Sequence, residues 1–472
     1  MKIFETYAES YPTVRDQRVV DLCLVNKYWN TVANDTPQLW TRINLSFPFA
    51  EHQVAAAHKR VSASKLEKID VSIDFRKPKW NWDEPVDDWD GSIRHQVREI
   101  TNLLRGTEER WKSIKVVSHT WLPLHMLMEV WTFTHLPSTE SISMERDNSI
   151  LGMWTIRQRP QSLIGPMTLF GQNASLPKLR NLTLCGVHVD WDDASVCYQN
   201  LRKLEINKMT YDVGPSFEQF AAMLSSSPRL EYLDVTGFSP EHHTIPDPPD
   251  GRLPKIPVVH LPALKELVFG WKNTEDGYSF LHTFQIGSSL ERLTLIHTES
   301  CIRAQTKNRR PWWHQDSDRI FTALYNLGLA APQDEDDIPP GPFIAMRGMK
   351  NLRIIWTEVN ARSSLVPFLT MLTGLESIWL EDVDMQVLED VASVQVGMRS
   401  AMTSPPLTAN LRWSWRKEAP RLAEPSIVQL KNCGVKVTVK AVDYWKVWQG
   451  WSSSCWWVGG GHQPIVESLI IH

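Results

Sequence analysis

The sequence contains few cysteines and no long apolar run, and these two absences narrow the classes of protein that it can represent. Its six cysteines are scattered, and no two of them form a Cys-x-x-Cys pair. This usage is typical of free thiols in a reducing compartment, so we expect the cytoplasm or the nucleus. No apolar stretch approaches the roughly 20 residues of a membrane-spanning helix, and residues 1–7 carry no signal-peptide core. We therefore expect no membrane partner.

An excess of charge of either sign is also missing. Among 472 residues, 50 are Lys or Arg and 54 are Asp or Glu, which gives a formal net charge of −4. Phosphate binding needs a concentrated basic surface, so this balance argues against nucleic acid as the main partner. Hydrophobic residues make up 42% of the chain, as in globular proteins. The length predicts roughly two to four domains or one elongated array.

Motifs of the common catalytic and cofactor sites are absent as well. The chain has no Gly-x-Ser-x-Gly, no Gly-x-x-x-x-Gly-Lys-[Ser/Thr], no Gly-x-Gly-x-x-Gly and no His-Glu-x-x-His. His242-His243 stands in a Pro-rich stretch without Cys or carboxylate ligands at zinc spacing. We expect no metal, no cofactor and no enzymatic activity. An enzyme on an unrecognised α/β fold is the alternative, and a deep pocket with converging titratable groups would support it.

A short module recurs along the chain, with the pattern apolar, two variable, apolar, one variable, apolar. Its alternating last three positions predict a short strand with two side chains inward and one outward. The stretches between copies permit helices, and residues 217–224 are amphipathic. Clear copies begin at Leu179, Leu201, Leu230, Leu264, Leu290, Leu352 and Leu375, and weaker copies begin at Leu66, Trp111 and Thr139.

These modules predict how the chain folds. One strand-and-helix unit cannot bury its apolar face alone, so the units must stack. We therefore expect an α/β fold, an irregular leucine-rich-repeat solenoid over residues 46–440 with a parallel sheet on its concave face. A divergent repeat near residues 320–329 is expected to fill the gap of 62 residues between Leu290 and Leu352. A compact α/β domain whose buried strands share the leucine pattern is the alternative.

Several stretches interrupt or close this array. Residues 435–439 alternate cleanly and predict a closing strand. Residues 441–472 hold five of the 22 tryptophans, and we expect this Trp-rich tail to cap the end of the array. An aromatic platform for carbohydrate or lipid is the alternative for the tail. Loop insertions rich in Pro or charge are predicted near residues 239–262, 299–317, 332–342 and 404–425.

The outward positions of the modules suggest where a partner would bind. Trp356 and Trp379 are assigned to the outward position of consecutive copies, and Glu205 and Asp234 lie in the same column. Exposed tryptophan on a concave surface is typical of binding hot spots. We therefore predict a target-binding surface that includes Trp356, Trp379, Asp234 and Glu205. A loop that folds over both rings and buries them is the alternative.

The amino-terminal residues carry a second, separate signal. Residues 19–33 predict one helix with Leu22, Val25 and Trp29 on one face, and Thr36-Pro37 ends it before Leu39-Trp40. Trp followed at this distance by Pro-x-Leu-Trp resembles the second half of an F-box. Residues 1–45 are therefore identified as an F-box-like helical segment. Residues 1–7 are expected to be only the end of its first helix.

With its leucine modules and closing strand, the chain is similar to the large F-box families of mushroom-forming fungi. That resemblance implies a substrate receptor of an SCF-type (adaptor–cullin–F-box) ubiquitin ligase. The box would dock on a Skp-family adaptor within a cullin complex, and the repeats would hold an unknown target protein. A leucine-rich-repeat scaffold without ligase docking is the alternative. The resemblance implies adaptor contacts at Leu22, Val25, Trp29, Leu39 and Trp40.

Overall fold

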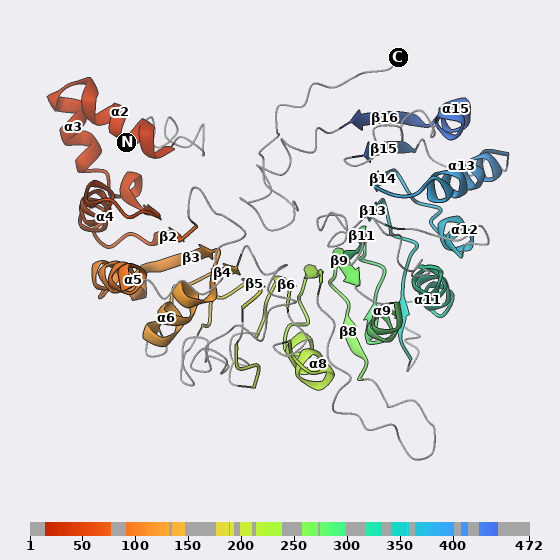
Figure 1. Ribbon diagram of the computed structural model, residues 1–472, viewed down its shortest axis with the longest axis horizontal. Helices are drawn as coiled ribbons and strands as arrows, with labels where there is room; N and C mark the ends of the chain where they lie inside the picture. The colour runs from red at the N-terminus through yellow and green to blue at the C-terminus, as the bar shows by residue number, and fades with distance from the viewer. Residues whose placement is uncertain are drawn as a thin grey trace. The chain divides into compact units, whose positions relative to one another are not determined.

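Parallel strands alternate with helices along the chain, which divides into two α/β units, residues 1–199 and 200–472 (Figure 1). Within its described residues, no helix is both long and apolar enough to cross a bilayer. The computed structural model describes residues 15–76, 91–131, 135–146, 176–187, 189–192, 199–209, 214–237, 257–271, 274–298, 317–332, 341–355, 357, 364–400, 407–413 and 424–441.

The first unit begins with two helices where the sequence predicts one. α2 (Arg15–Val25) ends one residue before α3 (Lys27–Asn34), and a 3₁₀ turn, η2 (Pro37–Trp40), follows. Asn26 separates the helices, because its side chain accepts a hydrogen bond of 2.8 Å from the backbone N–H of Trp29. Asparagine is a favoured N-cap residue, and its extended backbone at φ −167° starts a new helix. The prediction of one continuous helix over residues 19–33 was therefore wrong.

A five-stranded parallel sheet follows in the first unit, with its strands in chain order. Its inward side chains form one buried row, Ile43, Val71, Ile114, Ile142 and Leu182, none more than 1% exposed. Because the first strand starts at residue 42, the sheet takes in the last residues of the predicted segment 1–45. The strands are β1 (Arg42–Ser46), β2 (Ile69–Asp74), β3 (Trp111–Ser118), β4 (Ser141–Arg146) and β5 (Asn181–Cys185), and the helices beside them are α4 (Glu51–Ala63), α5 (Gly91–Leu104) and α6 (Trp121–Trp131).

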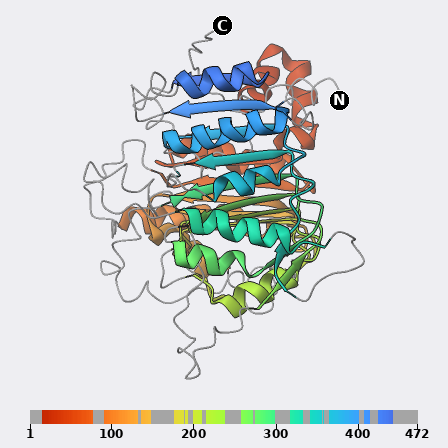
Figure 2. The same ribbon diagram turned by 90° about the vertical axis from the view of Figure 1, so that its right-hand side faces the viewer.

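The second unit repeats this arrangement with eight parallel strands, again in chain order. Its helices lie side by side along one face of the sheet (Figure 2). The strands are β6 (Lys203–Asn207), β7 (Tyr232–Val235), β9 (Glu266–Trp271), β11 (Arg292–His297), β13 (Asn351–Ile355), β14 (Ser377–Glu381), β15 (Thr408–Trp413) and β16 (Lys436–Ala441). The helices are α8 (Phe217–Ser225), α9 (Thr274–Leu281), α11 (Asp318–Leu329), α12 (Leu365–Thr370), α13 (Met385–Ser400) and α15 (Glu424–Asn432).

The leucine modules place the same side chains at the same height on neighbouring strands. Leu204, Leu233, Leu267 and Leu293 are register partners across β6, β7, β9 and β11, and each is at most 1% exposed. Leu182 holds the equivalent position in the sheet of the first unit. The predicted parallel sheet with helices on one face is thus confirmed within each unit. The amphipathic helix over residues 217–224 is confirmed as α8, which begins at a capping box of Ser216 and Gln219.

Two predicted module positions were wrong because the sheet shifts their register. Leu352 pairs with Leu293, so it occupies the second apolar position and Met349 takes the first. Val71 pairs with Ile114, which leaves Leu66 outside the core and 92% exposed. In both places the sequence offers apolar residues at two alternative starting points. Only pairing with the neighbouring strand selects one of them.

Three predicted insertions or repeats also differ from the structure. Residues 408–413, inside the predicted insertion 404–425, form β15 between β14 and β16, although buried Ala409 weakens the apolar pattern there. β11 pairs directly with β13, so residues 320–329 add helix α11 but no further strand to this sheet. The end of the insertion 239–262 is a strand of a small second sheet. That sheet joins β8 (Val259–Leu261), β10 (Phe284–Ile286) and β12 (Phe343–Ile344).

The predicted closing strand over residues 435–439 is confirmed as β16, the last strand of the described sheet. The remaining predicted insertions and the predicted tail are largely not described by the structure. Most of the predicted insertions 299–317 and 332–342 lies outside the described residues, and so does the Trp-rich tail after residue 441.

Candidate functional site

The amino-terminal helices close on a small apolar core of their own. This core contains Val19, Leu22, Ala33, Leu39 and Trp40, none more than 4% exposed. The indole Nε1 of Trp40 donates a hydrogen bond of 2.8 Å to the carbonyl oxygen of Ala33, which ties η2 to the end of α3. Leu22, Leu39 and Trp40, three of the predicted adaptor contacts, therefore lie inside the helical segment. They hold its shape, and their side chains do not reach its surface.

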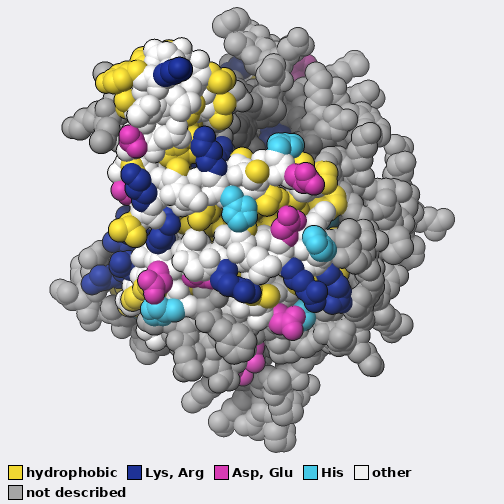
Figure 3. Space-filling model, turned by 90° about the vertical axis from the view of Figure 1, so that its left-hand side faces the viewer, with side chains coloured by type: hydrophobic (Ala, Val, Ile, Leu, Met, Phe, Trp, Pro, Cys, Tyr) yellow, Lys and Arg dark blue, Asp and Glu magenta, His cyan; other side chains and the backbone are white. Residues whose placement is uncertain are grey.

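The opposite side of these helices exposes apolar side chains to solvent. Leu24 is 76% exposed, Tyr28 73%, Val25 56% and Val20 41%. We call these four residues the apolar edge. Figure 3 shows hydrophobic side chains gathered on the helices at the top of the view. Of the predicted adaptor contacts, Val25 belongs to the apolar edge and Trp29 is half-buried.

The apolar edge has a signal in the sequence. Residues 19–25 read Val-Val-Asp-Leu-Cys-Leu-Val, which is more apolar than one buried helical stripe requires. Val19 and Leu22 fill the core, so Val20 and Leu24 must face away from it. Several exposed apolar side chains within one short folded segment favour a surface that another molecule covers.

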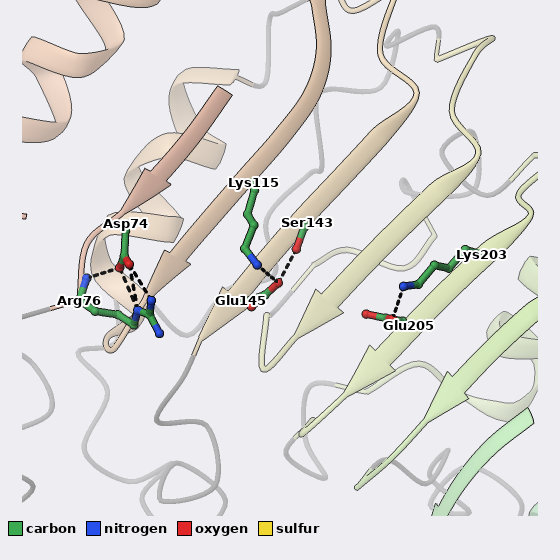
Figure 4. A network of polar contacts seen from close by, with 7 residues as sticks. All are labelled: Asp74, Arg76, Lys115, Ser143, Glu145, Lys203 and Glu205. Atoms are coloured by element: carbon green, nitrogen blue, oxygen red, sulfur yellow. Dashed lines mark hydrogen bonds and ion pairs between the residues drawn. The ribbon is translucent and has the colours of Figure 1, made fainter. Parts of the chain in front are cut away.

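A second surface is the face of each sheet formed by the alternate strand residues that do not pack against the helices. We call it the polar face. In the first unit it carries polar side chains that satisfy one another (Figure 4). The ammonium of Lys115 lies 3.2 Å from a carboxylate oxygen of Glu145, which also accepts a hydrogen bond of 2.6 Å from Ser143. The charged side chains in this part of the polar face therefore pair with one another.

Asp74 and Arg76 make a tight pair at the end of β2 in the same unit (Figure 4). Their closest nitrogen and oxygen atoms are 2.7 Å apart. Burial acts to raise the pKa of the Asp74 carboxyl, but hydrogen bonds and charge from Arg76, with a smaller effect of His119, lower it below its ordinary value. Asp74 is thus held as a carboxylate in an internal pair.

The first strands of the second unit carry a buried pair of acids on the polar face. Glu205 and Asp234 are register partners on β6 and β7, 9% and 2% exposed. Glu205 pairs with Lys203 at 2.7 Å (Figure 4), and Asp234 accepts hydrogen bonds from the backbone N–H and the hydroxyl of Thr236. Burial, and then the nearby Glu205, raise the pKa of Asp234 to about 7. Glu205 and Asp234, two of the four predicted target contacts, are therefore buried side chains.

The later strands of the same sheet carry an exposed aromatic ring beside a basic side chain. Trp379 on β14 is 42% exposed, and its register partners are Arg353 on β13 and Asn410 on β15. Glu381, two residues after Trp379, lies 2.7 Å from a guanidinium nitrogen of Arg353 and 3.4 Å from one of Arg412. We call Trp379, Arg353, Glu381 and Arg412 the Trp379 cluster.

Trp356, the predicted neighbour of Trp379, lies outside the described residues. The register gives the place beside Trp379 on β13 to Arg353. The sequence did not identify Arg353, Glu381 or Arg412 as site residues. Their signal was weak because an alternating strand places some residue at every outward position, whatever its use.

Neither a metal-ligating group nor a similarity to a known protein indicates another site in the described residues. Within the described ranges, no group of three or more His, Cys, Asp or Glu residues is placed to hold a metal ion. A comparison with models of known protein families and with curated proteins finds no match for the chain. The apolar edge and the Trp379 cluster are therefore the two candidate binding surfaces of the described residues.

Proposed function

We propose that this chain is the substrate-recognition subunit of an SCF-type ubiquitin ligase. Its amino-terminal helices dock on a Skp-family adaptor, and its repeated strands and helices form a leucine-rich-repeat-like solenoid that holds a target protein on the polar face. The observation that carries the proposal is the apolar edge. Four large apolar side chains stay in solvent on helices whose own core is already closed.

Rigidity of the docking segment supports this assignment. The exposed Leu24 and Tyr28 project from helices that Leu22, Trp40 and the hydrogen bond to Ala33 hold together. A preorganised apolar surface binds a partner without a large loss of conformational entropy. The resemblance of residues 24–40 to an F-box gives the partner its identity, a Skp-family adaptor.

The repeated architecture supports the receptor part of the proposal. In each unit, parallel strands pair in chain order, with a register shift between β2 and β3, and helices pack on one face while mostly polar side chains line the other. Stacked repeats of this kind offer an extended surface to a protein partner. The Trp379 cluster supplies the type of side chain that dominates binding energy at such surfaces, an exposed Trp beside Arg.

Adaptor docking is tested by co-expression of the full chain with a fungal Skp-family adaptor, followed by purification through a tag on the adaptor. We expect the unaltered chain to co-purify in equal amount. We expect the double variant Leu24→Glu and Tyr28→Glu to lose the complex, because charge at these exposed sites prevents apolar contact without disturbing the core.

Leu329→Glu on α11 is the matched control, since this leucine is also exposed, at 61%, but lies in the second unit. It should co-purify like the unaltered chain. Circular dichroism of all three proteins should be the same. If the unaltered chain does not bind the adaptor, the ligase assignment fails, and a repeat scaffold without ligase docking takes its place.

A further inference from the structure

The polar face of the second unit changes its charge along the sheet. On β6, β7 and β9 the outward positions hold Glu205, Asp234 and Glu266, and Lys203 is the single basic residue there. On β13 to β16 the outward positions hold one acidic residue, Glu381, against Arg353, Arg412 and Lys436. The end of the sheet that carries Trp379 therefore has a formal excess of positive charge.

Glu381 pairs with both arginines, so one carboxylate faces two guanidinium groups. Its side chain is 9% exposed, whereas those of Arg353 and Arg412 are 22% and 23% exposed. Each guanidinium has five N–H donors in a planar fork, so a fork that pairs with one carboxylate can also contact a second. The carboxylate thus fixes two arginine side chains on the strands that flank Trp379, with both still in contact with solvent.

The small number of basic side chains disfavours nucleic acid as the ligand. A phosphate backbone carries a charge at every nucleotide and is held by many Lys and Arg contacts, whereas Arg353, Arg412 and Lys436 are spread over three strands of this sheet. The chain as a whole carries a net charge of −4, which adds no long-range attraction for a polyanion. A carboxylate-bearing peptide needs only one or two guanidinium contacts, and its neighbouring side chain can pack on the indole ring.

We propose that the Trp379 cluster binds an extended acidic peptide segment whose apolar or aromatic side chain packs on Trp379 while its carboxylates contact Arg353 and Arg412. This inference deepens the proposed function, since it names the chemistry of the target, and it rests on the receptor role of the polar face. Adjacent strands are about 4.8 Å apart, so the span from β13 to β16 is about 14 Å, the length of about four extended residues.

The test selects binders from a library of random dodecapeptides displayed on phage, with the purified full chain as bait. Recovered peptides are synthesised with a fluorescent label, and their affinities are measured by anisotropy. We expect Asp and Glu to be enriched around one apolar or aromatic position. Trp379→Ala and Arg412→Gln should each weaken binding about tenfold or more. Amidation of the peptide carboxylates should have a similar effect.

Val428→Ala on α15 is the control, because this valine is 48% exposed on a helix of the same unit. It should bind the selected peptides like the unaltered chain. The proposal is overturned if the selection yields no peptide or yields neutral or basic ones, or if binding is the same in Trp379→Ala. Equal competition by a single-stranded dodecathymidylate would overturn it as well.

The two proposals fail separately. Adaptor co-purification depends on the apolar edge in the first unit, and peptide binding depends on the Trp379 cluster in the second. Peptide binding without adaptor binding would retain the acidic-peptide site and remove the ligase assignment. Adaptor binding without selection of acidic peptides would retain the ligase assignment and remove the acidic-peptide site.

Discussion

Arg353 and Trp379 are register partners on β13 and β14, and the guanidinium of Arg353 is held 2.7 Å from Glu381, two residues beyond the indole. The indole therefore has a fixed cation on the adjacent strand. Residues two apart in a strand share a face, so Trp379 and Glu381 point to the same side of the sheet. This arrangement links the exposed ring to the only acidic residue on the outward positions of β13 to β16.

Glu381→Gln should destabilise the second unit. The substitution removes the carboxylate that pairs with both Arg353 and Arg412, and it leaves two like charges on the strands that flank β14. We expect a loss of about 1.5–3 kcal/mol in the free energy of unfolding, the usual range for hydrogen bonds to charged groups. Urea denaturation measures it. Glu376→Gln, at an exposed position just before β14, should leave the midpoint unchanged.

The second unit should lose stability as the pH rises toward neutrality because of Asp234. Its pKa is raised from 3.8 to about 7 in the folded state, so the folded protein holds this proton more tightly than the unfolded chain. The contribution is fully present below about pH 4 and is lost as the pH rises through about 7. The slope should reach up to about 1.4 kcal/mol per pH unit in that window.

Asp234→Asn should remove most of this slope and leave the protein at least as stable at pH 8, because the amide keeps an acceptor for Thr236 and carries no buried charge. Denaturant midpoints between pH 4 and pH 8 provide the measurement. Glu389→Gln on the exposed side of α13 should retain the slope of the unaltered protein. A slope that persists in Asp234→Asn would show that another group is responsible.

Two glycines should respond in opposite ways to alanine. A Cβ at Gly270 in β9 would lie 2.9 Å from the Cα of Thr236 and 3.1 Å from a side-chain carbon of Thr298. Gly270→Ala should therefore cost about 1–3 kcal/mol through overpacking. Gly397 lies in helix α13, and a Cβ added there would meet no described atom within 4 Å. Gly397→Ala should stabilise by about 0.5–1 kcal/mol, and thermal denaturation of the two variants distinguishes them.

Much of the sheet could be predicted because its signals are local. The alternation in Leu182-Thr183-Leu184 and its relatives identifies a strand and its buried side without knowledge of any neighbour. β15 escaped prediction because Ala409 stands where the other copies carry a larger apolar residue. Its strand conformation follows from its place between β14 and β16, which bury that alanine completely.

The candidate surfaces were less predictable. The resemblance to an F-box implied adaptor contacts at Leu22, Leu39 and Trp40, but these apolar side chains lie in the core of the helical segment. It named Asp234 as an outward residue, and the position is outward, but the side chain is 2% exposed. Apolar periodicity thus finds a buried face, and it does not say which remaining residues stay in solvent.

The sequence by itself determined the strand-and-helix repeat, the inward leucines and the apolar excess of residues 19–25, because each depends on spacing along one short segment. Tertiary structure alone decided that Arg353 lies beside Trp379, that β15 joins the sheet, and that Leu24 and Tyr28 face solvent while Asp234 is buried. Register and burial depend on strands and helices that are distant along the chain, and no local pattern encodes which neighbour will cover a given side chain.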